Sequence, residues 1–224
     1  LSIRRQRQMC IRDSDNTILR GDSDYSWIEF LIKNNFVNSE VYNDKNKYFF
    51  DQYNQGTLNI NEYCSFAIGS FIDIGNKDLP KILDKFLLEI IEPMINIYAL
   101  RLIHKHYDNN DTLLLASATN KVLVDRIAER LEFKNVVATL PEVVNNKFTG
   151  NIIEPAALGS GKLIKVREWM ALNGFNDFQD TTFYSDSIND LPLLKEVENP
   201  IAVNPDNILR QESLNRSWEI IDLP

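Results

Sequence analysis

The chain has 224 residues, of which 44% are hydrophobic, 25% charged and 10% aromatic. This composition is typical of a globular protein and excludes wholesale disorder. The 24 Lys and Arg against 32 Asp and Glu give a formal charge of −8, which disfavours nucleic acid and anionic membranes as partners. The only cysteines, Cys10 and Cys64, build no disulfide framework, so we expect a cytoplasmic protein. No apolar run approaches the ~20 residues of a membrane-spanning helix.

The first twelve residues do not resemble a buried strand. A central strand of a parallel sheet is typically a nearly continuous apolar run, whereas this stretch contains Arg4, Arg5, Arg7 and Arg12. We predict that residues up to about 12 are not native and that the true sequence resumes at or near Asp13. If the segment is genuine, we expect the core to lose part of its central strand.

Residues 21–87 carry helical patterns and no convincing strand. Aromatic residues recur at helical spacing there, beginning with Trp27 and Phe30. We predict a small helical insertion over 21–87. A long helix is expected to follow from Lys81 to His106, interrupted near Pro93.

Short apolar runs alternate with amphipathic stretches in the rest of the chain. The expected strands are Leu113–Ala116, Val136–Thr139, Thr181–Ser185, Ile201–Val203 and a possible edge strand Trp218–Ile221, and the expected helices are Asn120–Leu131 and Ser160–Asn173, the second ended by Gly174. Lys147–Ile153 is predicted to belong to a hairpin around Gly150. The alternation indicates an α/β fold, a Rossmann-like parallel sheet with helices on both faces. We assign 1–20 and 88–224 to this core and 21–87 to an inserted small α-helical cap.

Asp13 and Asp15 are the first candidates for chemistry. In an extended chain, residues i and i+2 point the same way, so both carboxylates would project from one strand end. Such a pair repels unless a cation or a shared proton lies between the two groups, and oxygen ligands suit Mg²⁺. The alternative is an acidic turn without function, because an Asp-x-Asp-x-Thr string alone is a moderate signal.

Three further features follow along the chain. Ser117 ends a strand before a helix, where free amides can hold phosphate, although a plain N-cap is the commoner role. Lys162 lies in the first turn of a helix, where lysine opposes the helix dipole and a bound anion would compensate, unless the lysine is simply solvated. Asp186 directly follows a buried strand, at the sheet edge where α/β proteins bind ligands, and Asp190 can cap the next helix.

Taken in order, four strings resemble the motifs of the haloacid dehalogenase (HAD) superfamily, in particular its phosphoserine-phosphatase-like branch, subfamily IB. The strings are Asp13–Thr17, Ser117–Asn120, Gly161–Lys162 and Ser185–Asp190, and the resemblance extends from Asp13 to Ile221. It implies a Mg²⁺-dependent hydrolase that acts on a small phosphorylated metabolite through an aspartyl-phosphate. Arg12 departs from the pattern, because the family usually has an apolar or aromatic residue there.

The resemblance implies roles for the matched aspartates. Asp13 would be the nucleophile, and Asp15 would be the general acid for the leaving alcohol and then the base for water. Mg²⁺ would be held by the Asp13 carboxylate, the Asp15 main-chain carbonyl and Asp186.

It also implies a phosphate clamp. Ser117 and Lys162 would hold the phosphoryl oxygens, and Asp190 would orient Lys162 or a metal-bound water. Beside these motifs, we expect substrate contacts from Thr119, Asn120 and Asn189.

Asp22 stands where phosphoserine phosphatases place the acidic residue that binds the substrate's ammonium group, and Asp24 lies beside it. We therefore predict an amine-bearing substrate. The alternative is that both aspartates only solvate a hinge of the cap.

The cap has no arginine, although the same enzymes use a cap arginine for the substrate carboxylate. Ser65 falls at the matching place, and Lys45 or Lys47 could substitute for the arginine, although lysine replaces its fork-shaped group poorly. We therefore predict a substrate without an essential carboxylate, such as histidinol phosphate, with phosphoserine as the alternative.

Other classes fit less well. Gly159–Lys162 resembles the phosphate loop of a kinase, but Ala156 stands where that loop needs glycine and Leu163 replaces its Ser/Thr. A receiver-like signalling domain, which is not an enzyme, would lack the second aspartate and has about half this length. A phosphate-binding protein without activity is disfavoured because every catalytic position is filled.

Overall fold

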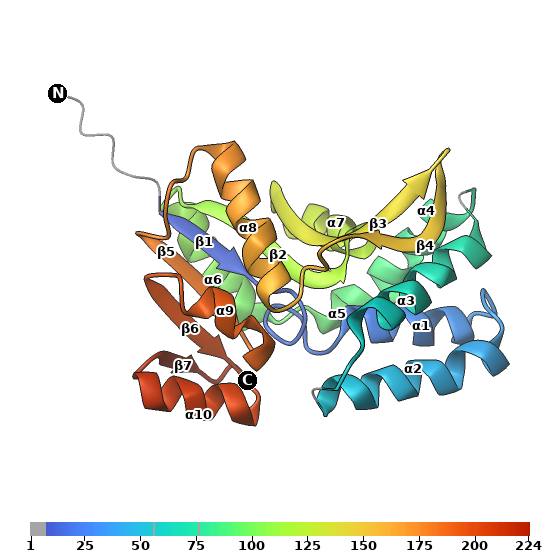
Figure 1. Ribbon diagram of the computed structural model, residues 1–224, viewed down its shortest axis with the longest axis horizontal. Helices are drawn as coiled ribbons and strands as arrows, with labels where there is room; N and C mark the ends of the chain where they lie inside the picture. Colours follow the sequence, from blue (N-terminus) through green and yellow to red (C-terminus); the bar gives the residue numbers. More distant parts are fainter. Residues whose placement is uncertain (1–7, 56, 76) are drawn as a thin grey trace.

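The computed structural model describes residues 8–55, 57–75 and 77–224, and a seven-stranded sheet forms the centre of this described part (Figure 1). The strands are β1 Met9–Arg12, β2 Thr112–Asn120, β3 Asn135–Val144, β4 Lys147–Ile153, β5 Thr181–Ser185, β6 Asn199–Val203 and β7 Glu219–Ile221. Their order is β4-β3-β2-β1-β5-β6-β7, and all neighbours run parallel except β3 and β4. The predicted α/β fold is confirmed.

The helices are α1 Ser23–Lys33, α2 Ser39–Asn54, α3 Ile60–Ile74, α4 Leu79–Phe86, α5 Glu92–Met94, α6 Ile97–Asp108, α7 Lys121–Arg130, α8 Ser160–Asn173, α9 Leu191–Leu194 and α10 Asn207–Arg216, with a π-helical turn at Leu87–Ile91 and a 3₁₀ turn at Ile188–Asp190. Helices α6 and α7 cover one face of this sheet, and α8, α9 and α10 cover the other. Cys10 packs in one apolar cluster with α6 and α7, while its neighbours Met9 and Ile11 pack in another with α8, α9 and α10. This alternation is that of a strand buried on both faces.

The central strand β1 is formed and fully buried, so the expectation that a genuine segment would cost the core part of this strand is wrong. Arg12 is accommodated because its guanidinium carbon lies 3.7 Å from the centre of the Tyr184 ring. Whether the residues up to about 12 are native stays a prediction, and residues 1–7 lie outside the described part.

The structure gives the exact positions of the predicted hairpin turn and of the predicted interruption in the long helix. The turn of the β3–β4 hairpin lies at Asn145 and Asn146, whose positive φ angles of 51° and 60° suit a tight hairpin turn, and Gly150 lies within β4. The predicted interruption of the long helix near Pro93 is found at Ile95, which is extended, while Pro93 itself stands in the first turn of α5 where no N–H is needed.

Helices α1–α4 lie together on the right of Figure 1, and in the sequence they stand between β1 and β2. Trp27 stacks on Phe71 with ring centres 5.4 Å apart, and Phe71 in turn meets Phe148 of β4 at 5.6 Å. At the base, Leu19 forms an antiparallel bridge with Ile95. The two ends of the segment are therefore held side by side.

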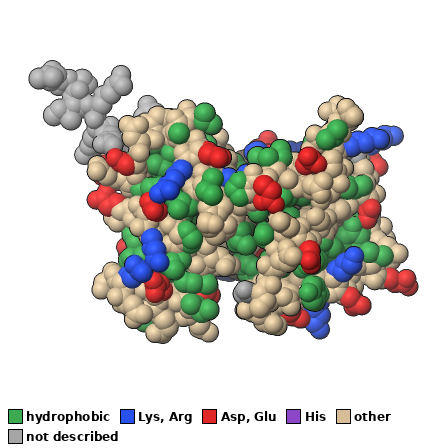
Figure 2. All heavy atoms as spheres, in the orientation of Figure 1, with side chains coloured by type: hydrophobic (Ala, Val, Ile, Leu, Met, Phe, Trp, Pro, Cys, Tyr) green, Lys and Arg blue, Asp and Glu red, His purple; other side chains and the backbone are tan. Residues whose placement is uncertain are grey.

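The surface carries no concentration of one charge on the face shown in Figure 2, where acidic and basic side chains are scattered. Within the described residues, no helix is long and apolar enough to cross a membrane.

Candidate active site

Four segments meet at the carboxyl ends of the central strands. Asp13 follows β1, Ser117 lies in β2, Asp186 follows β5, and Lys162 stands in the first turn of α8. Lys162 is only 1% exposed, and its Nζ donates to Asp13 Oδ2 at 2.9 Å and to Asp190 Oδ2 at 2.8 Å. The lysine that opposes its helix dipole is therefore buried between two carboxylates.

The Asp13 carboxylate is fixed at both oxygens. The Ser14 N–H donates to Oδ1 at 2.8 Å, while Lys162 holds Oδ2. Burial raises the pKa of Asp13 well above its usual range, although the Lys162 ammonium acts in the opposite direction. Behind it, Ser14 Oγ donates to Ser117 Oγ at 2.7 Å, which links the first two motifs.

Asp15 lies in a turn, so the chain does not stay extended from Asp13 as the sequence suggested. Its Oδ1 accepts from the Ser23 N–H at 2.9 Å, and its Oδ2 accepts from Thr119 Oγ1 at 2.7 Å and Ser23 Oγ at 3.1 Å. Burial raises the pKa of Asp15 despite these donors. The two aspartates nevertheless line the same cavity.

Asp186 faces the same cavity from the end of β5. Its Oδ1 accepts from Thr17 Oγ1 at 3.1 Å, and burial, followed by the charge of Asp190, raises its pKa to about 7. The Asp186 charge also raises the pKa of Asp13. Two buried carboxylates that repel each other are suited to a hard divalent cation.

A metal at this place would need main-chain oxygen as well. No group of three His, Cys, Asp or Glu side chains in the described ranges is arranged to hold a metal. The Asp15 carboxylate is already engaged with Ser23 and Thr119. The donor set that fits Mg²⁺ is therefore the Asp13 and Asp186 carboxylates with the Asp15 carbonyl, all of them oxygen ligands.

Asp190 has the N-cap position of α9 but makes no side-chain cap bond, contrary to the role expected from sequence. Its carboxylate instead accepts from Lys162 and, at 2.7 Å, from Ser185 Oγ. The ionic bond to a buried lysine takes precedence, because an unpaired buried ammonium is costly.

Asp22 and Asp24 line the cavity from the start of α1. Asp22 accepts from the Tyr25 N–H at 2.7 Å as the N-cap of α1, and Asp24 Oδ1 accepts from Asn120 Nδ2 at 2.7 Å. Burial raises the pKa of Asp22 to about 7 and that of Asp24 well above its usual range.

Several candidates lie outside the cavity. Asn120 is the N-cap of α7 and reaches the site only through Asp24. Asn189 is half-buried in the 3₁₀ turn and does not line the cavity. Ser65, Lys45 and Lys47 are exposed and are also absent from its lining, so the sequence alignment that placed Ser65 at a substrate-reading position is not supported by geometry.

Aromatic side chains from the helical segment form much of the cavity wall, and sequence reasoning missed this role. They are Tyr25, Phe49, Phe50, Tyr53 and Tyr63. Their helical spacing was visible, but it does not tell which of them face the core and which face the cavity. The full described lining holds five aspartates, from Asp13 to Asp186, and no lysine or arginine.

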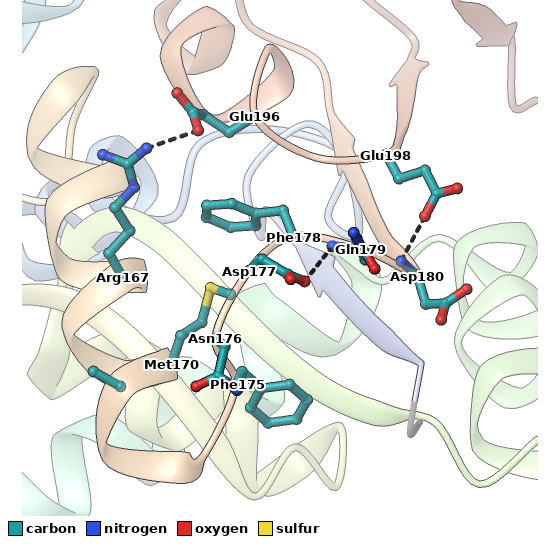
Figure 3. Close-up of a pocket in the computed structure, with 11 residues that line it drawn as sticks. Arg167, Met170, Phe175, Asn176, Asp177, Phe178, Gln179, Asp180, Glu196 and Glu198 are labelled. Carbon is teal, nitrogen blue, oxygen red and sulfur yellow. Dashed lines mark hydrogen bonds and ion pairs between the residues drawn. The ribbon is translucent and has the colours of Figure 1, made fainter. Parts of the chain in front are cut away.

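A separate hollow of about 800 Å³ lies at the other end of the strands, beside the start of β5. Figure 3 shows its polar groups paired with one another: Arg167 with Glu196 at 2.7 Å, and the Asp180 N–H with Glu198 at 2.6 Å. None of the candidate catalytic residues lines it.

The fold and the cavity together define a class of protein: an α/β fold with paired aspartates and a buried lysine at the carboxyl edge of its sheet, an arrangement suited to phosphoryl transfer. A family model described as haloacid dehalogenase-like hydrolase matches residues 10–195. The chain belongs to this family.

Individual relatives agree with that assignment. A histidinol-phosphatase of Neisseria meningitidis serogroup C is 31% identical over 219 residues, which cover 96% of this chain and 99% of that protein. A phosphoserine phosphatase of Mycobacterium tuberculosis is 37% identical over 134 residues, 60% of this chain and 43% of that protein.

A solved structure matches the whole fold. It is that of a protein of unknown function from Bordetella pertussis Tohama I, with a TM-score of 0.90 and 31% identity over 98% of this chain and 100% of that one. The predicted HAD membership and the phosphoserine-phosphatase-like branch are confirmed, and the chain is a phosphatase of the HAD type.

Proposed function

We propose that this chain hydrolyses a small amine-bearing phosphomonoester, with histidinol phosphate as the leading candidate, through an aspartyl-phosphate on Asp13. The observation that carries the proposal is the buried Lys162, bound to both Asp13 and Asp190. It supplies a fixed positive charge beside the nucleophile, where a phosphoryl group must be held. In this scheme residues 21–87 form a cap over the core made by 1–20 and 88–224.

The first chemical step transfers the phosphoryl group to the protein. A carboxylate oxygen of Asp13 attacks phosphorus, the ester P–O bond breaks, and the leaving alcohol takes a proton from Asp15. Burial raises the pKa of Asp15 and so favours the protonated acid that this step needs. Ser23 and Thr119 hold its carboxyl group in place.

The second step returns the enzyme to its starting state. Water attacks the phosphorus of the aspartyl-phosphate and gives its proton to Asp15, and the bond to Asp13 breaks to release inorganic phosphate. Ser117 lines the cavity and contacts the phosphoryl oxygens in both steps, and Lys162, which lies behind Asp13 and outside the lining, is expected to reach them beside the Asp13 carboxylate. Asp190 is a positioning residue, since it reaches the reacting group only through Lys162.

Mg²⁺ fits the proposed site at Asp13, Asp186 and the carbonyl of Asp15. When bound, it supplies positive charge that lets a carboxylate approach a phosphate dianion. We expect EDTA to abolish turnover and Asp186→Ala to raise the Mg²⁺ requirement sharply. Ca²⁺ is expected to inhibit, because its coordination is larger and looser. An enzyme indifferent to EDTA would contradict this part.

The charge of the cavity supports an amine on the substrate. Asp22 and Asp24 line it, and no lysine or arginine does so in the described chain. A carboxylate in such a cavity would meet like charge without a partner. Similarity to a histidinol-phosphatase supports the leading candidate, and similarity to a phosphoserine phosphatase keeps phosphoserine as the alternative.

The deciding measurement is kcat/KM for histidinol phosphate, phosphoethanolamine and phosphoserine with Mg²⁺. We expect both carboxylate-free substrates to exceed phosphoserine. A preference for phosphoserine above about tenfold, roughly 1.4 kcal/mol of transition-state binding, would overturn the substrate assignment and leave the phosphatase chemistry intact.

A further inference from the structure

We propose that Asn46 determines specificity by accepting a hydrogen bond from a ring N–H at the end of the substrate that is remote from phosphate. The inference rests on the proposed function and extends it from an amine to a planar nitrogen heterocycle. It starts from the side of the cavity that the catalytic groups do not occupy.

Asn46 stands on α2, is 1% exposed and lines the cavity. Its Nδ2 donates to the Tyr25 carbonyl at 3.3 Å and to Glu29 Oε1 at 3.2 Å. Both partners are acceptors, so they fix the amide with its nitrogen toward α1. The oxygen must therefore point away from them.

The Asn46 Oδ1 is an acceptor without a protein donor within 8–55, 57–75 and 77–224. It is also not among the atoms in these ranges that are sealed from solvent without a partner, and Asn46 itself lines the cavity. A ligand donor would stabilise this nearly buried amide oxygen. The desolvation penalty of a buried acceptor without a hydrogen bond is larger than the net stabilisation that a typical hydrogen bond contributes.

The surroundings of Asn46 suit a flat group. The ring centres of Tyr25 and Phe50 are 4.6 Å apart, and Phe49 and Tyr63 meet at 5.6 Å. All four rings line the same cavity as Asn46. Aromatic side chains bind planar rings favourably, by offset stacking and by edge-to-face contacts. A planar ring that carries an N–H, such as imidazole, satisfies both the walls and the acceptor.

A purely structural role predicts something different. As a tie between α1 and α2, Asn46 needs only its Nδ2 donor, and losing the tie would impair all substrates alike. A specificity role needs Oδ1 and affects only substrates with a ring donor. The two roles are separated by comparing substrates in the same variants.

The test measures kcat/KM with Mg²⁺ for histidinol phosphate, which carries imidazole, and for phosphoethanolamine, which has the amine but no ring. Asn46→Leu loses the tie as well as the acceptor, so both substrates should be impaired, but the ratio of kcat/KM for histidinol phosphate to that for phosphoethanolamine should fall about tenfold or more, mainly through KM for histidinol phosphate. Glu29→Ala is the matched control: it removes the tie partner, leaves the Asn46 acceptor, and should preserve the substrate ratio.

A double variant provides the rescue. In Asn46→Asp with Glu29→Gln, donor and acceptor of the bond between residues 46 and 29 exchange places, the bond to the Tyr25 carbonyl is lost, and the second carboxylate oxygen of Asp stays available as an acceptor. We expect the preference for histidinol phosphate to return to within about threefold of the wild type. Equal losses on both substrates in Asn46→Leu, or an unchanged ratio, would overturn the inference while the amine phosphatase stands.

Binding measurements test the role of Asn46 independently of the proposed phosphatase activity. If the wild type hydrolyses neither substrate, the proposed function fails, and calorimetry with histidinol against ethanolamine decides on Asn46. Tighter binding of histidinol that is lost in Asn46→Leu supports the inference. Equal binding of the two alcohols, or no effect of the substitution, overturns it.

Discussion

Lys162 shows how much a single buried charge can organise. Removing an ammonium from water is costly, and two carboxylates with good geometry are needed to compensate. Asp13 and Asp190 provide them, and both raise the pKa of Lys162 against the opposing effect of burial. The lysine therefore stays charged throughout the pH range in which a phosphatase would work.

The two aspartates proposed to be catalytic give the sharpest prediction for single residues. Asp13→Asn should abolish turnover and leave the fold intact, because the amide is nearly isosteric but cannot attack phosphorus. Asp15→Asn should slow turnover by about 10²–10⁴-fold through loss of proton transfer. Phosphate release from p-nitrophenyl phosphate with Mg²⁺ measures both, and circular dichroism checks the fold. Full activity of Asp13→Asn would end the assignment.

Arg12 yields a prediction about stability. Its three guanidinium nitrogens are buried and have no hydrogen-bond partner among the residues described, although the group stacks on Tyr184. Arg12→Met should therefore raise the free energy of unfolding by about 1–3 kcal/mol, because the desolvation cost disappears. Urea unfolding measures this change. A loss of stability would show that the stacking on Tyr184 outweighs the desolvation.

At the scale of elements, α8 is positioned by a contact that only glycine permits. A Cβ on Gly161 would lie 2.0 Å from the Ala156 carbonyl oxygen. Gly161→Ala should therefore push the start of α8 away and displace Lys162. We expect a lower melting temperature and at least about tenfold lower kcat/KM.

Gly69 in α3 provides the matched control. Its added Cβ would meet Tyr42 Oη at 3.7 Å, an ordinary contact. Gly69→Ala should be neutral or slightly stabilising, because alanine favours a helix over glycine by up to about 1 kcal/mol. If both substitutions have the same effect, close packing at Gly161 does not explain its importance.

Elements with strong local signals were predictable from sequence. The predicted bounds of β5 and α8 are those observed, and Gly174 ends α8 with a φ of 79°. The interruption of the long helix near Pro93 was predicted and lies at Ile95, but the turn at Asn145 and Asn146 was missed, because glycine is a stronger local signal than the residues that actually bend the chain there.

Predictability of the site follows the same rule. Asp13, Lys162 and Asp186 stand in short strings and could be found, and the structure brings them together. Ser23 and the aromatic walls act through contacts that no spacing encodes. Asn46 belongs to this second group, since its partners lie on another helix.

At the scale of the whole molecule, the acidic cavity should make stability depend on pH. The folded-state pKa values of Asp22 and Asp186 are raised to about 7, so the folded protein binds protons that the unfolded chain releases above about pH 4. Stability from these groups is present at low pH and is lost as the pH rises through 7. In EDTA, the melting temperature should fall between pH 5.5 and pH 8.

The control for this prediction keeps the fold and removes one charge. Asp22→Asn retains an N-cap of similar strength for α1 and should flatten the pH dependence. Added Mg²⁺ should restore part of the stability at pH 8, because a ligand of the folded state stabilises it. A melting temperature that rises from pH 5.5 to pH 8 in EDTA would contradict the raised pKa values.

The bridge between Leu19 and Ile95 has a consequence for how such proteins diversify. It is reinforced by the Asn96 N–H, which donates to the Ile18 carbonyl at 2.9 Å, and by the Arg20 N–H, which donates to the Met94 carbonyl at 2.8 Å. The two connections between the core and helices α1–α4 are thus hydrogen-bonded to each other at one place. An insertion that begins and ends at a common point can change in length and sequence without altering the strands below it. The helices beyond the first turn of α1, whose Ser23 holds Asp15, can therefore vary in length and sequence while the strands and the groups at their carboxyl ends stay constant.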